Sequence, residues 1–192
     1  MKVLLFNGSP HKNGCTYTAL QEIANTLKEE GIDSEIYQIG TGSITPCRAC
    51  YACAKIGKCV INDDKVNEFV DYAADFDGYI FGSPVHFGSA CGGITAFLDR
   101  AFFVSFRGGR NVFPHKPAAA IVSARRAGTT AALDQLNKYF MISQMPVIDT
   151  GDQEKHICRQ PLHKDGDYFH TRQNNDRKLD TLNDYLVRPY GI

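Results

Sequence analysis

The sequence predicts an α/β fold: a doubly wound, five-stranded parallel sheet of order 2-1-3-4-5 with helices on both faces. Short apolar runs alternate along the chain with longer amphipathic stretches, an alternation typical of parallel strands joined by crossover helices. The chain has 192 residues, of which 43% are hydrophobic and 22% are charged. This size and composition are those of one globular domain.

The expected elements follow one another in the order of that fold. Strands are predicted where short apolar or alternating runs are bounded by turn residues, over 2–6, 33–39, 77–82, 117–123 and 145–148. Helices are predicted where apolar residues recur at helical spacing, over 16–30, 64–74, 88–104, 128–143 and 172–187. Residues 149–171 carry no clear element, so we expect either a functional or a poorly ordered segment there.

The charge and hydropathy of the chain exclude some classes of partner. Its 21 Lys and Arg residues balance its 21 Asp and Glu residues, so no long-range field draws it to nucleic acid or to an anionic membrane. No apolar run reaches the roughly 20 residues that span a bilayer. The opening apolar residues 1–6 lead directly into a turn, unlike a signal peptide. We therefore expect a cytoplasmic protein, with its thiols reduced.

The loop after the first strand has the composition of an anion site. Residues 7–16 contain two glycines and lead into the first helix, where free backbone N–H groups attract anions. Ser9 and Thr16 add hydroxyl donors, and His11 or Lys12 adds charge. The loop matches neither a Walker A motif nor G-x-G-x-x-G. It predicts a phosphate site, and the alternative is a plain turn with Thr16 near the helix cap.

The loop after the third strand combines an aromatic ring and an imidazole with small residues. Pro84 favours an extended backbone at Ser83, and His86 and Phe87 follow. A flat ligand such as an isoalloxazine ring needs an aromatic or apolar wall of this kind, together with backbone groups for its polar edge. The alternative is a core-facing Phe87 beside a surface His86.

Four of the seven cysteines fall within thirteen residues. Cys47, Cys50, Cys53 and Cys59 are spaced C-x2-C-x2-C-x5-C, between the second strand and the next helix. Three cysteines at this spacing suit three corners of an iron–sulfur cubane. The fourth cysteine would reach the cubane after a short excursion of the chain through Gly57. Zinc sites usually pair two C-x2-C knuckles across a longer span, and a thioredoxin-like pair needs only one C-x-x-C. Four reduced thiols that pack a loop remain the alternative.

Together these loops resemble those of the NAD(P)H-dependent FMN reductases of the flavodoxin-like superfamily. The resemblance covers about residues 1–148, and the motifs that carry it are Asn7-Gly8-Ser9-Pro10 with Asn13-Gly14 and Thr16, Gly-Ser-Pro-Val-His-Phe-Gly at 82–88, Ala-Phe-Leu-Asp-Arg at 96–100 and Ser-Ala-Arg-Arg-Ala-Gly-Thr-Thr at 123–130. It implies a flavodoxin-like, single FMN-binding domain over 1–192. This domain has a cysteine-rich loop at 46–60 and a divergent C-terminal segment at 149–192.

The resemblance also implies an FMN site built from three loops. Residues of the first loop hold the phosphate: Ser9, His11, Asn13, Gly14, Cys15 and Thr16. Residues of the second line the isoalloxazine: Pro84, Val85, His86, Phe87 and Gly88. Residues of the third lie at its other edge: Ser123, Arg125, Arg126 and Gly128. The family often has Arg in place of His11 and Asn in place of Cys15. Since an imidazole carries less positive charge than a guanidinium at neutral pH, we expect weaker phosphate binding.

Within that superfamily the cysteine run resembles that of the iron–sulfur flavoproteins. This resemblance implies that Cys47, Cys50, Cys53 and Cys59 ligate a [4Fe–4S] cluster that passes electrons to FMN. In that group subunits associate so that the two centres approach each other. The superfamily commonly forms dimers or tetramers, so we expect a homodimer or homotetramer.

The first functional hypothesis is an FMN-dependent oxidoreductase that transfers electrons from NAD(P)H to flavin and on to an acceptor. The flavin carries the chemistry, so no side chain is expected to act as a catalytic acid or base. Arg125 and Arg126 would stabilise negative charge on the flavin. The second hypothesis is an iron–sulfur flavoprotein electron carrier reduced by ferredoxin. The third is a non-redox phosphate- or zinc-binding module on the same fold.

Overall fold

A computed structural model describes residues 1–148 and 157–158 of the chain. Its strands are β1 Lys2–Asn7, β2 Asp33–Gln38, β3 Gly78–His86, β4 Ser89–Ala90, β5 Ala118–Ser123 and β6 Ile157–Cys158. Its helices are α1 Cys15–Glu29, α2 Cys53–Ile56, α3 Val66–Ala73, α4 Gly92–Arg107 and α5 Thr129–Ile142. No helix in this described part is long and apolar enough to cross a membrane.

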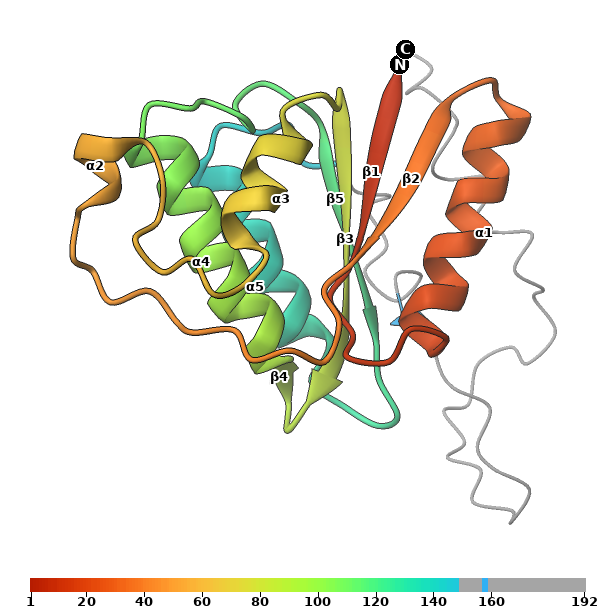
Figure 1. Cartoon of the computed structure of the whole chain (residues 1–192). Helices are drawn as coiled ribbons and strands as arrows, with labels where there is room; N and C mark the ends of the chain where they lie inside the picture. Colours follow the sequence, from red (N-terminus) through yellow and green to blue (C-terminus); the bar gives the residue numbers. More distant parts are fainter. Residues whose placement is uncertain (149–156, 159–192) are drawn as a thin grey trace, which may run out of the picture.

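The strands form a parallel sheet of order β2-β1-β3-β5-β6, to which β4 adds a short antiparallel pair on β3. Leu5 of β1 lies opposite Ile36 of β2 on one side and Ile80 of β3 on the other. The predicted fold class and strand order are therefore confirmed. Because the strands run in the same direction, the loops that follow β1, β3 and β5 all leave one edge of the sheet (Figure 1).

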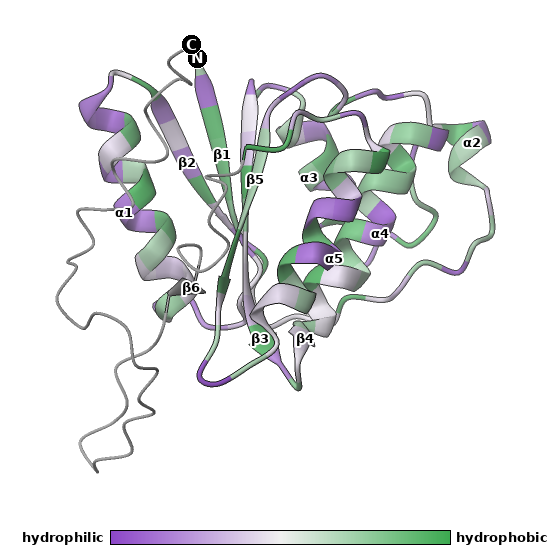
Figure 2. Ribbon diagram, turned by 180° about the vertical axis from the view of Figure 1, so that it is seen from behind, coloured by the Kyte–Doolittle hydropathy of each residue, from purple (hydrophilic) through white to green (hydrophobic). Residues whose placement is uncertain are grey.

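Helices cover both faces of the sheet. In Figure 1, α1 lies on one face, and α3, α4 and α5 lie on the other. Successive side chains of a strand point to opposite faces, so Leu5 packs in the core under α1 and Phe6 packs in the core under α3 to α5. Figure 2 shows β1 hydrophobic along most of its length, as a strand buried on both faces requires.

Aromatic rings fix α4 against the sheet. The ring of Phe97 lies 5.1 Å from that of Phe6 on β1 and 5.1 Å from that of Phe69 on α3, measured between ring centroids. All three side chains are almost completely buried. Since such pairs add stability beyond the area that they bury, α4 is a rigid support for the residues along its length.

The third strand and the fourth helix differ from the prediction. The predicted strand over 77–82 continues as β3 to His86, and a hairpin then leads through β4 into α4 at Gly92, not at residue 88. The hairpin pairs His86 with Ser89. The small and turn-forming residues of 82–89 gave no alternating apolar pattern from which a strand could be predicted.

The outer strand also differs. Residues 145–148 were predicted as a strand, but they contribute only one bridge, from Val147 to Ala118. Pro146 has no backbone N–H and cannot take part fully in a ladder. The position beside β5 belongs instead to β6, in a stretch where we expected no clear element. The rest of 149–171 and the predicted helix over 172–187 lie outside the described residues.

Candidate functional site

The loop after β1 is held in shape by side chains from two strands. Asn7 Oδ1 accepts a hydrogen bond from the Ser9 backbone N–H at 3.1 Å. Gln38, at the end of β2, donates to the Ser9 carbonyl at 2.7 Å and accepts from Asn7 Nδ2 at 2.5 Å. These hydrogen bonds hold the backbone of the loop in shape. Gln38 was not predicted from the sequence, where its only signal is that it is a polar residue at the carboxyl end of a strand.

The N-terminus of α1 lies beside this loop and has no side-chain cap. Gly14 is the N-cap residue, and a Cβ atom there would lie 3.4 Å from His11 Cβ and 4.0 Å from Ser9 Oγ. Thr16 is buried, and its hydroxyl lies 2.9 Å from that of Ser123 at the end of β5. Uncapped N–H groups with hydroxyls beside them suit an anion. The structure thus brings these predicted phosphate residues together, with His11 and Asn13 exposed and Cys15 partly exposed.

The loop after β3 is a tight two-residue turn. Phe87 and Gly88 have φ of 52° and 83°, as in the type I′ turn of a hairpin. Phe87 is fully exposed, at 110% of its reference area. Pro84, Val85 and His86 belong to β3 itself. An aromatic residue with positive φ and no buried contact is unusual, and such outliers often occur at ligand sites.

The loop after β5 touches that turn. Gly128 has φ of 92°, and a Cβ atom there would lie 2.6 Å from the Cα atom of Gly88. Arg125 and Arg126 are exposed in the same loop. The loops after β3 and β5, predicted to hold opposite edges of a flat ring, are therefore adjacent. The three loops together offer an uncapped helix N-terminus, an exposed aromatic ring and two cations.

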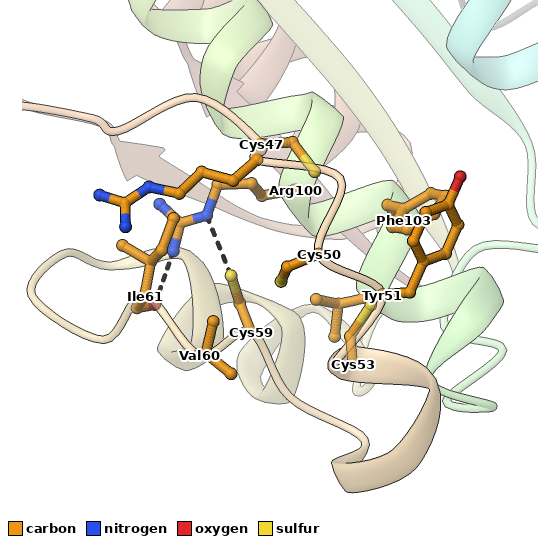
Figure 3. Close-up of a pocket in the computed structure, with 11 residues that line it drawn as sticks. Cys47, Cys50, Tyr51, Cys53, Cys59, Val60, Ile61, Arg100 and Phe103 are labelled. Atoms are coloured by element: carbon orange, nitrogen blue, oxygen red, sulfur yellow. Dashed lines mark hydrogen bonds between the residues drawn. The ribbon is translucent and has the colours of Figure 1, made fainter.

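The second candidate site is the cysteine segment, which packs on α4 away from this edge of the sheet (Figure 1). Cys47, Cys50, Cys53 and Cys59 line one pocket together with Arg100 and other residues (Figure 3). No three His, Cys, Asp or Glu side chains of the described part of the chain are close enough to hold a single metal ion. A polynuclear cluster does not require the four sulfurs to meet at one point, because each of its iron atoms is bound by a different cysteine.

The backbone around the first three cysteines is strongly curved. Ala49 and Tyr51 have φ of 51° and 57°, and Ala52 follows in the right-handed region with φ of −60°. A left-handed residue followed by a right-handed one, as at Tyr51 and Ala52, can turn successive N–H groups toward one side, an arrangement that suits anionic groups such as iron–sulfur clusters. The Tyr51 ring packs edge-on against Phe103 of α4, with centroids 5.7 Å apart, and anchors the loop.

The fourth cysteine is reached through α2, a short helix that the sequence analysis did not predict. Gly57 ends α2 with φ of 68°, as its predicted role in the return of the chain requires. Asn67 of α3 then fixes the Cys59 backbone, accepting from its N–H at 2.8 Å and donating to its carbonyl at 2.9 Å. Nothing in the sequence pattern marked Asn67 for this role.

The ionisation of several neighbouring thiols is electrostatically unfavourable. Burial raises the pKa of the Cys53 thiol, and negative charge on Cys50 and Cys59 would raise it further, while the backbone N–H of Ala54 acts in the opposite direction. Positive charge in the pocket would favour the thiolates. Arg100 supplies such a charge and donates from Nε to Cys59 Sγ at 3.3 Å.

The two candidate sites lie toward opposite ends of α4. At its start, the Cys91 Sγ donates to the Gly8 carbonyl at 3.2 Å, under the loop after β1. Further along, Arg100 and Phe103 line the cysteine pocket. At a rise of about 1.5 Å per residue, Cys91 and Phe103 are roughly 18 Å apart along the helix. Both sites thus have a rigid support in common but share no described lining residue.

The chain is similar in sequence to known flavoproteins. A family model described as NADPH-dependent FMN reductase matches residues 1–153. An iron–sulfur flavoprotein of Methanocaldococcus jannaschii is 32% identical over 158 residues, which are 81% of this chain and 80% of that protein. An iron–sulfur flavoprotein of Methanosarcina thermophila is 26% identical over 181 residues, or 93% of each chain.

Solved structures share the fold. A flavodoxin from the domain Archaea has a TM-score of 0.53 at 15% identity and covers 87% of each chain. The flavoenzyme NAD(P)H:(acceptor) oxidoreductase from Paracoccus denitrificans has a TM-score of 0.60 at 16% identity, over 79% of this chain and 76% of that one. A flavone reductase has a TM-score of 0.59 at 18% identity, and the match covers 78% of this chain but only 52% of that protein. The flavodoxin-like fold is confirmed.

Proposed function

Because the chain belongs to the NADPH-dependent FMN reductase family, we propose that it is an FMN-dependent oxidoreductase that also carries a [4Fe–4S] cluster. Two observations support the cluster in this proposal. The four cysteines of the run line a single pocket on α4, and the curated relatives are named iron–sulfur flavoproteins. Thiols that only packed a loop would not need a common pocket.

We assign the FMN to the carboxyl edge of the sheet. The uncapped N-terminus of α1 and the hydroxyls of Ser9 and Thr16 suit its phosphate. The β3–β4 hairpin with Phe87 would wall the ring, and Arg125 and Arg126 would place positive charge at its other edge. The wider set assigned to FMN is that of the sequence analysis: Ser9, His11, Asn13, Gly14, Cys15, Thr16, Pro84, Val85, His86, Phe87, Gly88, Ser123, Arg125, Arg126 and Gly128.

We assign the cluster to Cys47, Cys50, Cys53 and Cys59. The donor set is chemically suitable, since thiolates are the usual ligands of such clusters. The left-handed residues Ala49 and Tyr51 curve the backbone around the pocket, and the N–H of Ala54 points its positive end at the Cys53 sulfur. When bound, FMN and the cluster supply the electron-transfer chemistry, and the chain positions them and limits access of water.

Two electron donors are candidates. A one-electron carrier such as a reduced ferredoxin would approach the cysteine segment, because residues 46–60 hold Arg48, Lys55 and Lys58 and no acidic residue. NAD(P)H is the second candidate, favoured by the family description. It would dock directly over the flavin, because the sequence has no G-x-G-x-x-G motif. A homodimer or homotetramer remains our expectation for the assembly.

Anaerobic stopped-flow spectroscopy distinguishes these donors. We expect a reduced ferredoxin to reduce the flavin of the wild-type chain faster than NADPH does. Cys53→Ser should lose this reaction while dithionite still reduces its flavin. Cys91→Ser is the matched control, because Cys91 is a buried cysteine outside the run and serine keeps a donor for the Gly8 carbonyl. Fast reduction by NADPH alone, equal in wild type and Cys53→Ser, would identify a simple FMN reductase. A chain that takes up no FMN would favour the non-redox module.

A further inference from the structure

One guanidinium ties the whole cysteine segment to α4. Arg100 is only 1% exposed, although arginine is rarely buried without partners. Its Nη1 donates to the Thr45 carbonyl at 3.1 Å, and its Nη2 donates to the Ile61 carbonyl at 2.7 Å. It also forms a buried ion pair with Asp64 and a hydrogen bond to Cys59 Sγ at 3.3 Å. The acceptors thus lie on both sides of the cysteine run.

The contact with sulfur is the unusual one. A neutral thiol accepts hydrogen bonds weakly, whereas a thiolate or a metal-bound thiolate carries negative charge and accepts them well. Figure 3 shows the guanidinium beside the Cys59 side chain, with its Nε–H directed at the sulfur. The planar fork of Arg100 is held in this orientation by its other bonds, so the donor does not have to reorganise when the charge on the sulfur changes.

The carboxylate of Asp64 reduces the positive electrostatic potential that Arg100 produces at the Cys59 sulfur. The Asp64 side chain is 4% exposed, so its carboxylate is little screened by water and balances most of the guanidinium charge. The pair therefore presents a dipole whose positive end faces the sulfur. A guanidinium is not deprotonated in proteins, and that of Arg100 is in addition paired with a carboxylate. The guanidinium remains charged.

We propose that Arg100 and Asp64 are positioning residues that set the reduction potential of the cluster through the Cys59 sulfur. This inference rests on the proposed function, since it requires a cluster in the cysteine pocket. Reduction adds one electron, and hence negative charge, to the cluster and its sulfurs. A hydrogen bond to a ligand sulfur is then stronger in the reduced state and raises the potential. The carboxylate of Asp64 acts in the opposite sense.

A redox titration of three variants separates this role from a structural one. In each, iron and acid-labile sulfide are assayed, and the cluster and flavin potentials are measured by absorbance and electron paramagnetic resonance. Arg100→Met removes the donor and its charge, and Asp64→Asn keeps an oxygen acceptor but removes the counter-charge. Arg107→Met is the matched control, because Arg107 is an exposed arginine on the same helix that stacks on Phe106 and does not line the pocket.

We expect the cluster potential to become more negative in Arg100→Met and more positive in Asp64→Asn. The control should keep the wild-type value, and the flavin potential should not change in any variant. Unchanged potentials with full iron content, or shifts of the same sign in both variants, would overturn the inference. If Arg100→Met does not fold, the cluster potential of Asp64→Asn alone tests the inference. An unchanged or more negative potential in Asp64→Asn would then overturn the inference. Failure of the proposed function is distinguishable, because the wild-type chain would then contain no iron.

Discussion

Phe87 conflicts with the turn that contains it. A type I′ turn favours Asn or Gly at its first central position, yet a phenylalanine with φ of 52° stands there. Its ring is fully exposed and gains nothing from burial. A backbone conformation of this kind costs on the order of 1–3 kcal/mol. The cost is understandable if the ring has a task at the proposed flavin site.

Phe87→Asn should therefore have opposite effects on stability and on binding. We expect the free energy of unfolding of the FMN-free chain to rise by about 1 kcal/mol, because Asn tolerates positive φ. FMN affinity should fall, because the aromatic wall is lost. Chemical denaturation and a fluorescence titration with FMN measure the two effects. Phe87→Tyr keeps the ring and should keep the affinity. Unchanged FMN binding in Phe87→Asn would remove Phe87 from the site.

Gln38 affects the same site without facing a ligand in the proposed arrangement. Its amide joins Asn7 to the Ser9 carbonyl, and Gln38→Leu would leave both groups without these partners. We expect FMN affinity to fall about tenfold, the equivalent of one lost buried hydrogen bond. Calorimetric titration with FMN measures this affinity in the wild-type chain and in the variant. Gln21→Leu on α1 is the matched control, and an equal loss there would contradict a specific role for Gln38.

The regular elements of the fold could be predicted from local pattern, and the hairpin could not. The runs that became β1 and α1 have clear strand or helix periodicity. By contrast, β4 has two residues, and α2 has four, too few for a period to be recognised. β6 lies in a stretch where polar residues hide its pattern. The position that it takes beside β5 is decided by tertiary pairing.

In the candidate sites, too, some features could be predicted from the sequence and others could not. The spacing of the four cysteines was enough to predict that they lie together, as they do in one pocket. The supporting side chains were missed because their partners are set by the packing of elements. Gln38 contacts a residue 29 positions away, and Arg100 contacts Asp64 36 positions away. Helix or strand periodicity carries no information about such contacts.

The contact between the loops after β3 and β5 gives a prediction for Gly128. In Gly128→Ala, the new Cβ would overlap the Gly88 backbone and the residue would keep a positive φ. We expect unfolding free energy to fall by about 2 kcal/mol or more, with weaker FMN binding. Gly42→Ala is the control, because open space surrounds Gly42, and it should change stability by less than about 0.5 kcal/mol. Equal stability of the two variants in chemical denaturation would contradict the close approach.

The molecule as a whole separates its two candidate sites along α4. The N-terminal end of the helix lies under the loop after β1, and Arg100 and Phe103 face the cysteine pocket. Between them the helix is fixed to the sheet by buried aromatic rings such as Phe97. A rigid support of this kind should transmit little structural change from one site to the other.

Removal of iron should therefore leave FMN binding intact. We expect chelation under reducing conditions to abolish the iron content while the dissociation constant for FMN changes by less than about twofold, because no described residue lines both sites. The FMN titration is repeated before and after chelation, and Cys53→Ser provides the same state by mutation. Release of FMN together with iron would show that the sites are coupled and would contradict their separation.

The most direct measurement is the content of iron, acid-labile sulfide and FMN in the chain purified without oxygen. About four irons and four sulfides per chain, with one FMN, are expected for a [4Fe–4S] flavoprotein. Cys53→Ser should lose the iron and sulfide, and Cys91→Ser should keep them. FMN bound to a chain that contains neither iron nor sulfide would contradict the cluster and leave the four cysteines as thiols of a simple flavin reductase.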